Sequence, residues 1–193
     1  MAYADTDVLP ILSGVGGNFN AVDSDGNMVE FNSYFGNVVV IAFGYTNCAD
    51  ICPFTLGYLK KLYAQLNEEE QEHVKILFVT VDPEYDTPAH LNDFLNYFNK
   101  DFIGISGTKE QTDHIVSIYQ AQYNELSREG MPTHNIRRIN TKLLENDEEE
   151  KAKLFSHSVS IYLVDKEGFT RSIEFTGTPK DKFVEKIQQL IKE

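Results

Sequence analysis

The sequence of 193 residues has few cysteines, few basic residues and no long apolar run. Its two cysteines are too few for a disulfide scaffold, so we expect the pair to carry chemistry. Seventeen lysines and arginines against 30 acidic residues give a net charge of −13. That balance argues against nucleic acid and anionic membranes as partners, because both are bound through basic patches. The run of about 18 apolar residues that a membrane span needs is also missing.

The beginning of the chain offers no targeting signal. Residues 1–14 lack both the basic start and the apolar stretch of a signal peptide, so the sequence alone leaves the compartment open. We read the excess of acidic residues as a source of solubility, with a basic protein partner or electrostatic attraction of cations as the alternatives. The length suits one domain, which we assign to residues 18–193 after an N-terminal extension, residues 1–17.

Strand and helix patterns alternate along this domain. Residues 18–32 read as a β-hairpin around a Ser-Asp-Gly-Asn turn. β-Branched runs predict buried strands, and apolar residues at helical spacing predict amphipathic helices, with Thr178-Pro179 capping the last one. Between residues 127 and 153 the pattern is lost, and we expect a long acidic insertion. The predicted strands are 38–44, 74–81, 102–107, 158–165 and 169–175, and the predicted helices lie around 56–66, 91–98, 108–119 and 180–191.

This order of elements predicts an α/β fold of the thioredoxin-like type. Strands that alternate with helices imply a mixed central sheet flanked by helices on both faces. The two cysteines follow the first buried strand and open the first long helix, as a thioredoxin-like redox pair does. The expected additions to that fold are the N-terminal hairpin and the acidic insertion, which precedes His157 and the strand after it.

Both cysteines lie in the stretch "TNCADICPFTL", four positions apart as Cys48 and Cys52. On one helical turn their β-carbons would be about 5–6 Å apart, which permits either a disulfide or a shared metal ion. A nearby helix N-terminus would stabilise thiolates and lower their pKa. Because the chain has no second cysteine pair, a closed structural zinc site is disfavoured, and soft thiolates favour Cu(I). Two buried structural cysteines remain the plain alternative.

A metal site would need a third ligand, for which the chain offers five histidines. His157 alone opens a predicted strand, and its alternation with Val159, Ile161 and Leu163 indicates that it faces inward. A lone inward histidine is more often a satisfied core residue than a ligand, so the pattern leaves its role open. The candidates are His73, His90, His114, His134 and His157.

Three motifs together resemble the Sco/SenC family. "TNCADICPFTL" is similar to the family's T-x-C-P-D-x-C-P, "VDPEYDTP" to V-D-P-x-x-D-T-P, and "HSVSIYLVD" to H-S-x-x-x-Y-L-x-D. They occur in the family's order, and the resemblance extends from about Phe19 to Ile191. Each motif alone is a weak signal, whereas the three in order are specific.

The resemblance implies a thioredoxin-like protein that binds copper, as Cu(I), Cu(II) or both, through Cys48, Cys52 and His157. Sco proteins help to assemble the dinuclear copper site of cytochrome c oxidase. The implied partners are the oxidase subunit that holds this site and another copper chaperone or a thioredoxin-like reductant. The family is usually tethered by an N-terminal membrane helix, facing the periplasm or the mitochondrial intermembrane space, and we see no such helix in this sequence.

The sequence departs from the family pattern at three positions. Ala49 stands where proline is usual, Tyr85 where arginine is common, and Ser156 where an acid is frequent. These departures bear on the tuning of the site rather than on the ligands. In "VDPEYDTP" we expect Asp86 or Thr87 to cap the next helix, and we regard Asp82 as a weaker candidate for influencing thiolate or histidine protonation.

Four functions therefore compete. The first is a copper-binding assembly factor that uses Cys48, Cys52 and His157. The second is a thiol–disulfide oxidoreductase that uses Cys48 and Cys52 as a redox pair, toward the oxidase copper site or another periplasmic substrate. A peroxidase that reacts through a low-pKa thiolate is a distant third. The fourth is a binding module whose acidic surface docks a basic partner, with the cysteines incidental.

Overall fold

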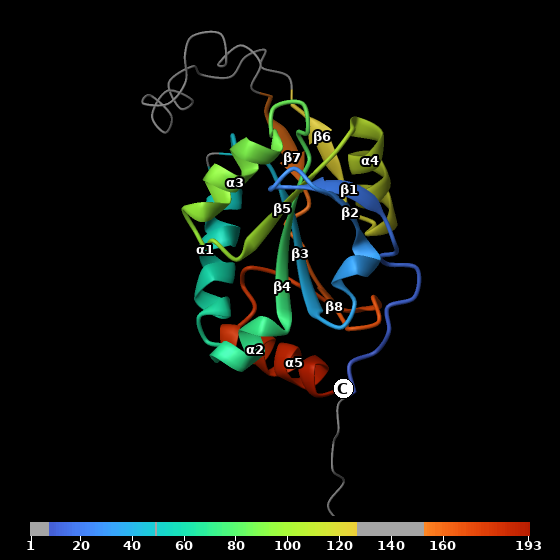
Figure 1. Ribbon diagram of the computed structural model, residues 1–193, viewed down its shortest axis with the longest axis vertical. Coiled ribbons are helices and arrows are strands. Elements are labelled where there is room, and N and C mark those ends of the chain that lie inside the picture. The colour runs from blue at the N-terminus through green and yellow to red at the C-terminus, as the bar shows by residue number, and fades with distance from the viewer. Residues whose placement is uncertain (1–7, 49, 127–152) are drawn as a thin grey trace, which may run out of the picture.

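A computed structural model describes residues 8–48, 50–126 and 153–193 of the chain (Figure 1). The predicted acidic insertion, residues 127–153, lies outside the described residues except for Lys153, and so do residues 1–7 of the predicted extension. Among the described helices, none combines the length and the apolar character needed to cross a membrane.

A seven-stranded mixed sheet forms the centre of the molecule, in the order β2-β1-β5-β4-β3-β8-β9. β3 and β4, and β4 and β5, run parallel, whereas the other neighbours are antiparallel. All seven residues of β3 are buried, which agrees with its β-branched sequence. The strands are β1 (Asn20–Asp23), β2 (Met28–Glu30), β3 (Val38–Gly44), β4 (Val74–Thr80), β5 (Phe102–Ser106), β8 (Ile161–Val164) and β9 (Thr170–Glu174).

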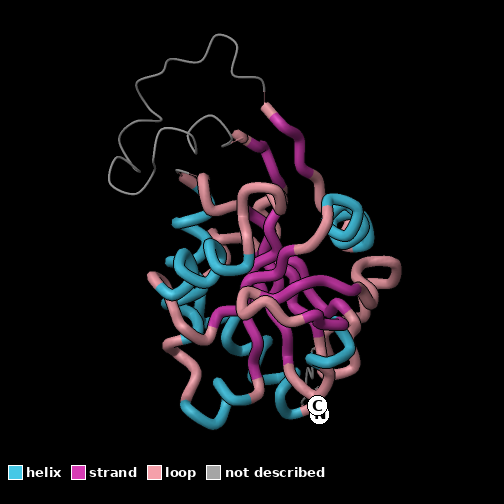
Figure 2. The backbone as a smooth tube through the Cα atoms, turned by 45° about the horizontal axis from the view of Figure 1, so that its top comes forward, coloured by secondary structure: helices cyan, strands magenta, loops and turns pink. Residues whose placement is uncertain are grey.

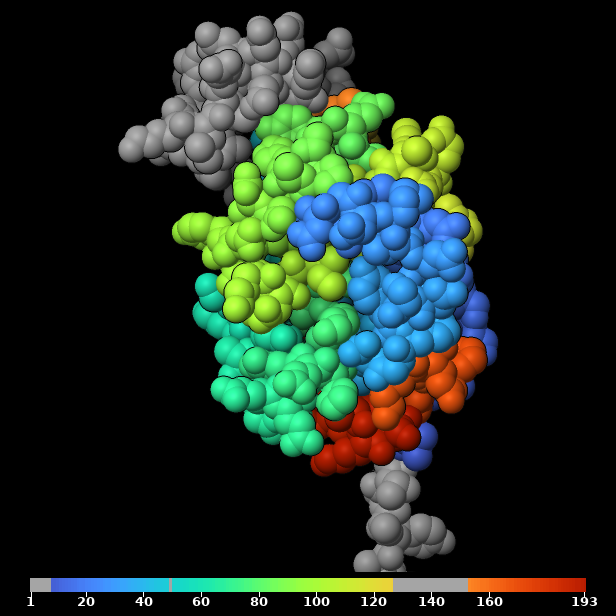
Figure 3. Space-filling view, viewed as in Figure 1, coloured from blue at the N-terminus to red at the C-terminus, as the bar shows by residue number. Residues whose placement is uncertain are grey.

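Helices cover both faces of this sheet, as predicted (Figures 1 and 2). α1 and α3 connect parallel strands and lie together on one face, where α5 packs against α1, while α4 lies on the other face. The N-terminal hairpin joins the sheet through β5 and lies against α3, so that their surfaces meet in Figure 3. The helices are η1 (Phe31–Tyr34), α1 (Ile51–Tyr63), α2 (Glu68–Glu72), α3 (Pro88–Asn96), α4 (Lys109–Ile118) and α5 (Lys180–Lys192).

Side-chain caps begin α3, as predicted, and α4. Thr87 accepts a hydrogen bond from the backbone N–H of His90, and Thr108 forms a capping box with Gln111. The prediction for Thr178 is wrong. Pro179 occupies the N-cap of α5, and the Thr178 hydroxyl instead donates to a carboxylate oxygen of Glu174 at 3.1 Å.

A second, two-stranded sheet lies beyond the end of β3 and carries His157. β6 (Tyr123–Glu125) pairs antiparallel with β7 (Phe155–His157), and Tyr123 is opposite His157. The prediction that His157 opens the strand of Ile161 is therefore wrong. His157 ends its own short strand, and residues 158–160, which separate it from β8, are not in a strand.

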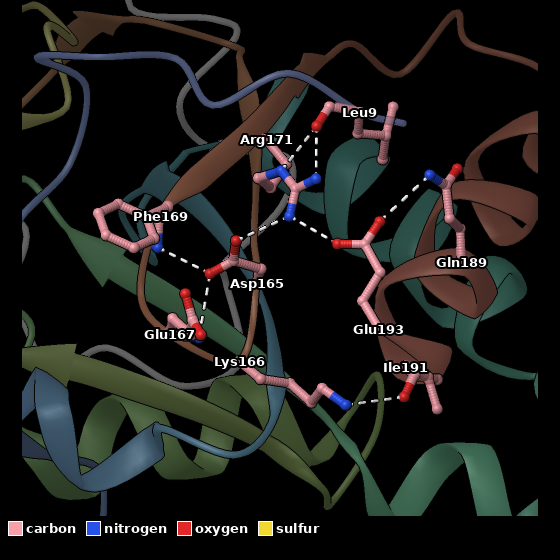
Figure 4. A network of polar contacts seen from close by, with 9 residues as sticks. All are labelled: Leu9, Asp165, Lys166, Glu167, Phe169, Arg171, Gln189, Ile191 and Glu193. Atoms are coloured by element: carbon pink, nitrogen blue, oxygen red, sulfur yellow. Dashed lines mark hydrogen bonds and ion pairs between the residues drawn. The ribbon is translucent and has the colours of Figure 1, made fainter. Parts of the chain in front are cut away.

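The two ends of the described chain meet at the guanidinium of Arg171 on β9 (Figure 4). Arg171 donates to the carbonyl of Leu9, to Asp165 at 2.9 Å and to Glu193 at 2.7 Å. The Asp165 carboxylate also accepts from the backbone N–H of Glu167 and Phe169, which fixes the turn between β8 and β9. Residues 8–17 thus pack along the domain.

Candidate metal centre

The two cysteines and His157 meet at the end of β3. Cys48 lies in the loop after this strand and Cys52 in the first turn of α1, and both are buried free thiols. One ligand atom from each of the three side chains lies within 4.8 Å of the other two. Across the part of the chain that the structure describes, this is the sole group of three or more histidine, cysteine or acidic residues close enough to hold a metal ion.

The surroundings of His157 set its tautomer. Nδ1 lies 2.9 Å from the backbone carbonyl of Ser158, and Nε2 lies 3.2 Å from Cys52 Sγ. A carbonyl oxygen only accepts hydrogen bonds, so the ring proton belongs on Nδ1. Nε2 then presents its lone pair to the sulfurs, which is the form of imidazole that binds metals.

The two thiols differ in acidity because one donates to the other. A hydrogen bond from the Cys52 thiol, together with the backbone N–H groups of Asp50 and Cys52, lowers the pKa of Cys48 to about 4 although burial opposes this. The pKa of Cys52 is raised by the same hydrogen bond, by burial and by repulsion from the Cys48 thiolate. The metal-free site therefore holds one thiolate at neutral pH, with a thiol beside it.

Comparison with known proteins identifies the family. The family model described as SCO1/SenC matches residues 12–192, nearly the whole chain. The chain belongs to the SCO1/SenC family. The resemblance of the three motifs is thereby confirmed.

Relatives and solved structures of the family cover most of this chain. A SCO2-like protein of Rickettsia felis is 27% identical over 168 residues, which are 86% of this chain and 73% of the relative. Yeast Sco1 with copper bound is 26% identical with a TM-score of 0.73, over 93% of this chain and 90% of that one. Copper-bound ScoI of Bradyrhizobium japonicum, 24% identical with a TM-score of 0.74 over 91% and 99%, shares the fold. The thioredoxin-like architecture is thus confirmed.

In this SCO1/SenC protein, Tyr45 holds the strand that carries His157. Its hydroxyl donates to the carbonyl of Phe155 at 3.3 Å and accepts from the N–H of the same residue at 3.2 Å. Its ring meets Phe155 and His157 edge-on, with centroids 5.3 and 5.9 Å apart. A side chain thus takes the place of a neighbouring strand along the free edge of β7. Sequence reasoning missed Tyr45, although its position directly after β3 and beside the cysteine loop was a usable signal.

Gly44, also missed from the sequence, leaves the space that Cys52 occupies. A β-carbon at Gly44 would lie 2.6 Å from the Phe78 ring and 2.9 Å from Cys52 Sγ, both closer than real contacts allow. The last position of β3 therefore excludes a side chain so that the Cys52 sulfur can pack against the backbone.

In "VDPEYDTP" the predicted cap of α3 falls on Thr87, and Asp86 has another part. Asp86 does not cap α3, because Thr87 does. Asp86 is fully buried and accepts from the backbone N–H and hydroxyl of Thr46 and from the hydroxyl of Thr80. It thereby anchors the cysteine loop to the end of β4, and burial still raises its pKa. The backbone N–H of Asp82 donates to the hydroxyl of Thr80, and its carbonyl accepts from the backbone N–H groups of Tyr85 and Asp86.

Proposed function

We propose that this protein binds copper through Cys48, Cys52 and His157, and that it delivers copper during assembly of the dinuclear copper site of cytochrome c oxidase. The observation that carries the proposal is the cluster of two sulfurs and one imidazole nitrogen within 4.8 Å. In this reading copper is cargo that the protein receives and passes on.

The donor set suits copper. Thiolate sulfur selects soft ions such as Cu(I), and imidazole serves Cu(I) and Cu(II) alike. The His157 tautomer leaves Nε2 available, and the low pKa of Cys48 supplies one thiolate before metal arrives. Binding then needs to remove only the proton of Cys52. Three protein ligands leave a position through which copper can pass to another protein by ligand exchange.

Relatives support the same reading. Yeast Sco1 and Bradyrhizobium ScoI have been solved with copper bound, and a relative from Stutzerimonas stutzeri is named a putative copper-binding protein. BsSco, which shares the fold, is a member of the Sco family of cytochrome c oxidase assembly proteins. We extend this role to the present chain, with the copper-site subunit of the oxidase as acceptor and a second copper chaperone or a thioredoxin-like reductant as further partner.

The proposed place of action is the periplasm or the mitochondrial intermembrane space. Relatives include mitochondrial Sco proteins and a Bacillus anthracis lipoprotein.

Copper titration followed by absorption spectroscopy tests the ligand set. The wild type should bind one Cu(II) and show a thiolate-to-Cu(II) charge-transfer band, which His157→Ala should weaken and shift. His114→Ala removes an exposed histidine of α4, so it serves as the matched control and should behave as wild type. If His157→Ala binds Cu(I) and Cu(II) as tightly as the wild type, the three-ligand proposal is wrong.

The asymmetry of the two thiols favours a second candidate, thiol–disulfide exchange. A Cys48 thiolate could attack a disulfide of a partner, after which Cys52 could resolve the mixed disulfide once it loses its proton, so that the partner is reduced and Cys48 and Cys52 are oxidised. Exchange activity that survives His157→Ala but is lost in either cysteine variant would support this reading. A wild type without exchange activity would refute it.

A further inference from the structure

A pocket of about 330 Å³ lies between the end of β4 and the two-stranded sheet of β6 and β7. Asp82 lines it from the loop after β4. Tyr123 and Phe155 contribute aromatic surface from the two-stranded sheet, and charged side chains complete the lining. Phe155 is also the residue whose backbone Tyr45 holds. The pocket is therefore distinct from the cysteine–histidine cluster but shares a strand with it.

Asp82 is the unusual group in this pocket. It is only 2% exposed, and its Oδ2 atom has no hydrogen-bond partner among the described residues. A buried carboxylate oxygen without a donor is costly, and most buried polar atoms in proteins are paired. A ligand that brings a hydrogen-bond donor and a positive charge would satisfy this atom.

The other charges of the pocket are already paired. Lys153 lies 3.0 Å from Glu84 and 3.6 Å from Glu125, and Lys109 lies 2.7 Å from an oxygen of Asp113. With the Asp82 carboxylate ionised, the lining holds four carboxylates and two ammonium groups, so an excess negative charge remains. This electrostatic balance favours a cation.

The cation that fits is organic. The carboxylates of the pocket do not come together closely enough to form a group that could hold a metal ion in the described chain. The volume exceeds what a single ion needs, and the rings of Tyr123 and Phe155 offer apolar surface for an aliphatic stem. A guanidinium or ammonium group on such a stem meets both requirements.

We propose that this pocket receives an arginine or lysine side chain of a partner polypeptide, with Asp82 as its counter-ion. Phe155 and His157 are two positions apart on β7, or about 7 Å along a strand. A polypeptide docked at the metal centre would thus lie within reach of the pocket. The choice of a polypeptide over a free amine rests on the proposed function, whereas the affinity for a cation does not.

Amide chemical shifts of the metal-free chain test the pocket with the peptide acetyl-Gly-Arg-Gly-amide. The control peptide carries citrulline, which has the shape of arginine without its charge. Burial raises the pKa of Asp82 to about 6, so titration at pH 8 keeps the carboxylate ionised. We expect the arginine peptide to shift the amides of Asp82, Glu125 and Phe155, with a Kd on the order of millimolar for so small a ligand.

The Asp82→Asn variant should bind the arginine peptide roughly tenfold more weakly or worse, as expected when a hydrogen bond to a charged group is lost. Asp93→Asn, which removes an exposed acid of α3, is the matched control and should behave as wild type. Equal binding by Asp82→Asn, or equal binding of the citrulline peptide, would overturn the proposal. Agmatine binding more than tenfold tighter than the peptide would overturn its assignment to a polypeptide.

Copper titration of the same preparations separates this proposal from the proposed function. A chain that binds copper but not the arginine peptide refutes the pocket alone. A chain that binds the peptide but not copper refutes the copper site and leaves the cation pocket standing.

Discussion

Replacement of Tyr45 by phenylalanine isolates the contribution of one hydroxyl to the candidate metal centre. The variant loses both hydrogen bonds to the backbone of Phe155, at 3.2 and 3.3 Å, and keeps the ring contacts with Phe155 and His157. Both distances are at the long end of the usual range, so each bond is worth about 0.5–1 kcal/mol net. We therefore expect β7 to detach about 1–2 kcal/mol more easily, which corresponds to roughly a tenfold change in the opening equilibrium.

This local change has a kinetic readout. If movement of His157 away from the cysteines is the step that frees copper from the proposed site, easier opening should speed copper release to a chelator by up to roughly tenfold. The equilibrium affinity for copper should fall less, because the state with β7 held by residue 45 remains the main state of the free protein. Hydrogen exchange at the amides of β7 should accelerate by a similar factor.

Tyr58→Phe is the matched control for this experiment. It removes a hydroxyl that donates to the carbonyl of Thr178 at 2.9 Å, so its cost to the free energy of unfolding is also about 1 kcal/mol. It should lower the melting temperature without changing copper release. If both variants release copper at the same rate, or if Tyr45→Phe releases it as slowly as the wild type, the hydroxyl of Tyr45 does not position His157.

Three further predictions concern the supports of the site. Gly44→Ala should displace Cys52 and destabilise the fold by about 1–3 kcal/mol through overpacking. Thermal unfolding would detect the loss of stability and copper titration the displacement of Cys52. Unchanged copper binding would contradict this prediction. Asp86→Ala should leave the backbone N–H and hydroxyl of Thr46 without their acceptor and cost about 1–3 kcal/mol. Faster amide exchange at Thr46 would show this loss, and wild-type exchange there would refute the anchor. Because the folded-state pKa of Asp82 is raised from 3.8 to about 6, the wild type should lose up to about 3 kcal/mol of stability as pH rises from about 4 to 6. Denaturant titrations should show that Asp82→Asn lacks this loss. If the free energy of unfolding changes equally with pH in both proteins, a buried Asp82 charge is excluded.

The central sheet was predictable because its strands carry a strong local signal. β3 and β4 are runs of β-branched and aromatic residues bounded by polar turns, and the burial of every residue of β3 follows from helices on both faces. The position of the cysteines was predictable for the same reason, since their loop directly follows β3. Local patterns of this kind do not depend on distant contacts.

The strand of His157 was mispredicted because short strands with exposed side chains carry no such pattern. β6 has three residues, none of them buried, and β7 likewise has three. Alternation counted back from Ile161 fails, since the chain leaves the strand at residues 158–160 and Val159 is 38% exposed. Only the motif resemblance, which pattern reasoning could not supply, indicated that His157 would meet the cysteines.

The hydrogen bonds of Asp86 and Tyr45 explain how a site built from the cysteine loop, the start of α1 and the short strand β7 keeps its shape. Cys52 and His157 are 105 positions apart, and both cysteines are free, so no covalent bond joins the segments. Asp86 holds the cysteine loop from the side of β4, and Tyr45, in the same loop, holds β7. Because Tyr45 directly precedes Thr46, the two anchors act through one stretch of backbone. A candidate metal centre held by hydrogen bonds rather than by a crosslink can open at the cost of a few such bonds, as the proposed transfer of copper to another protein would require.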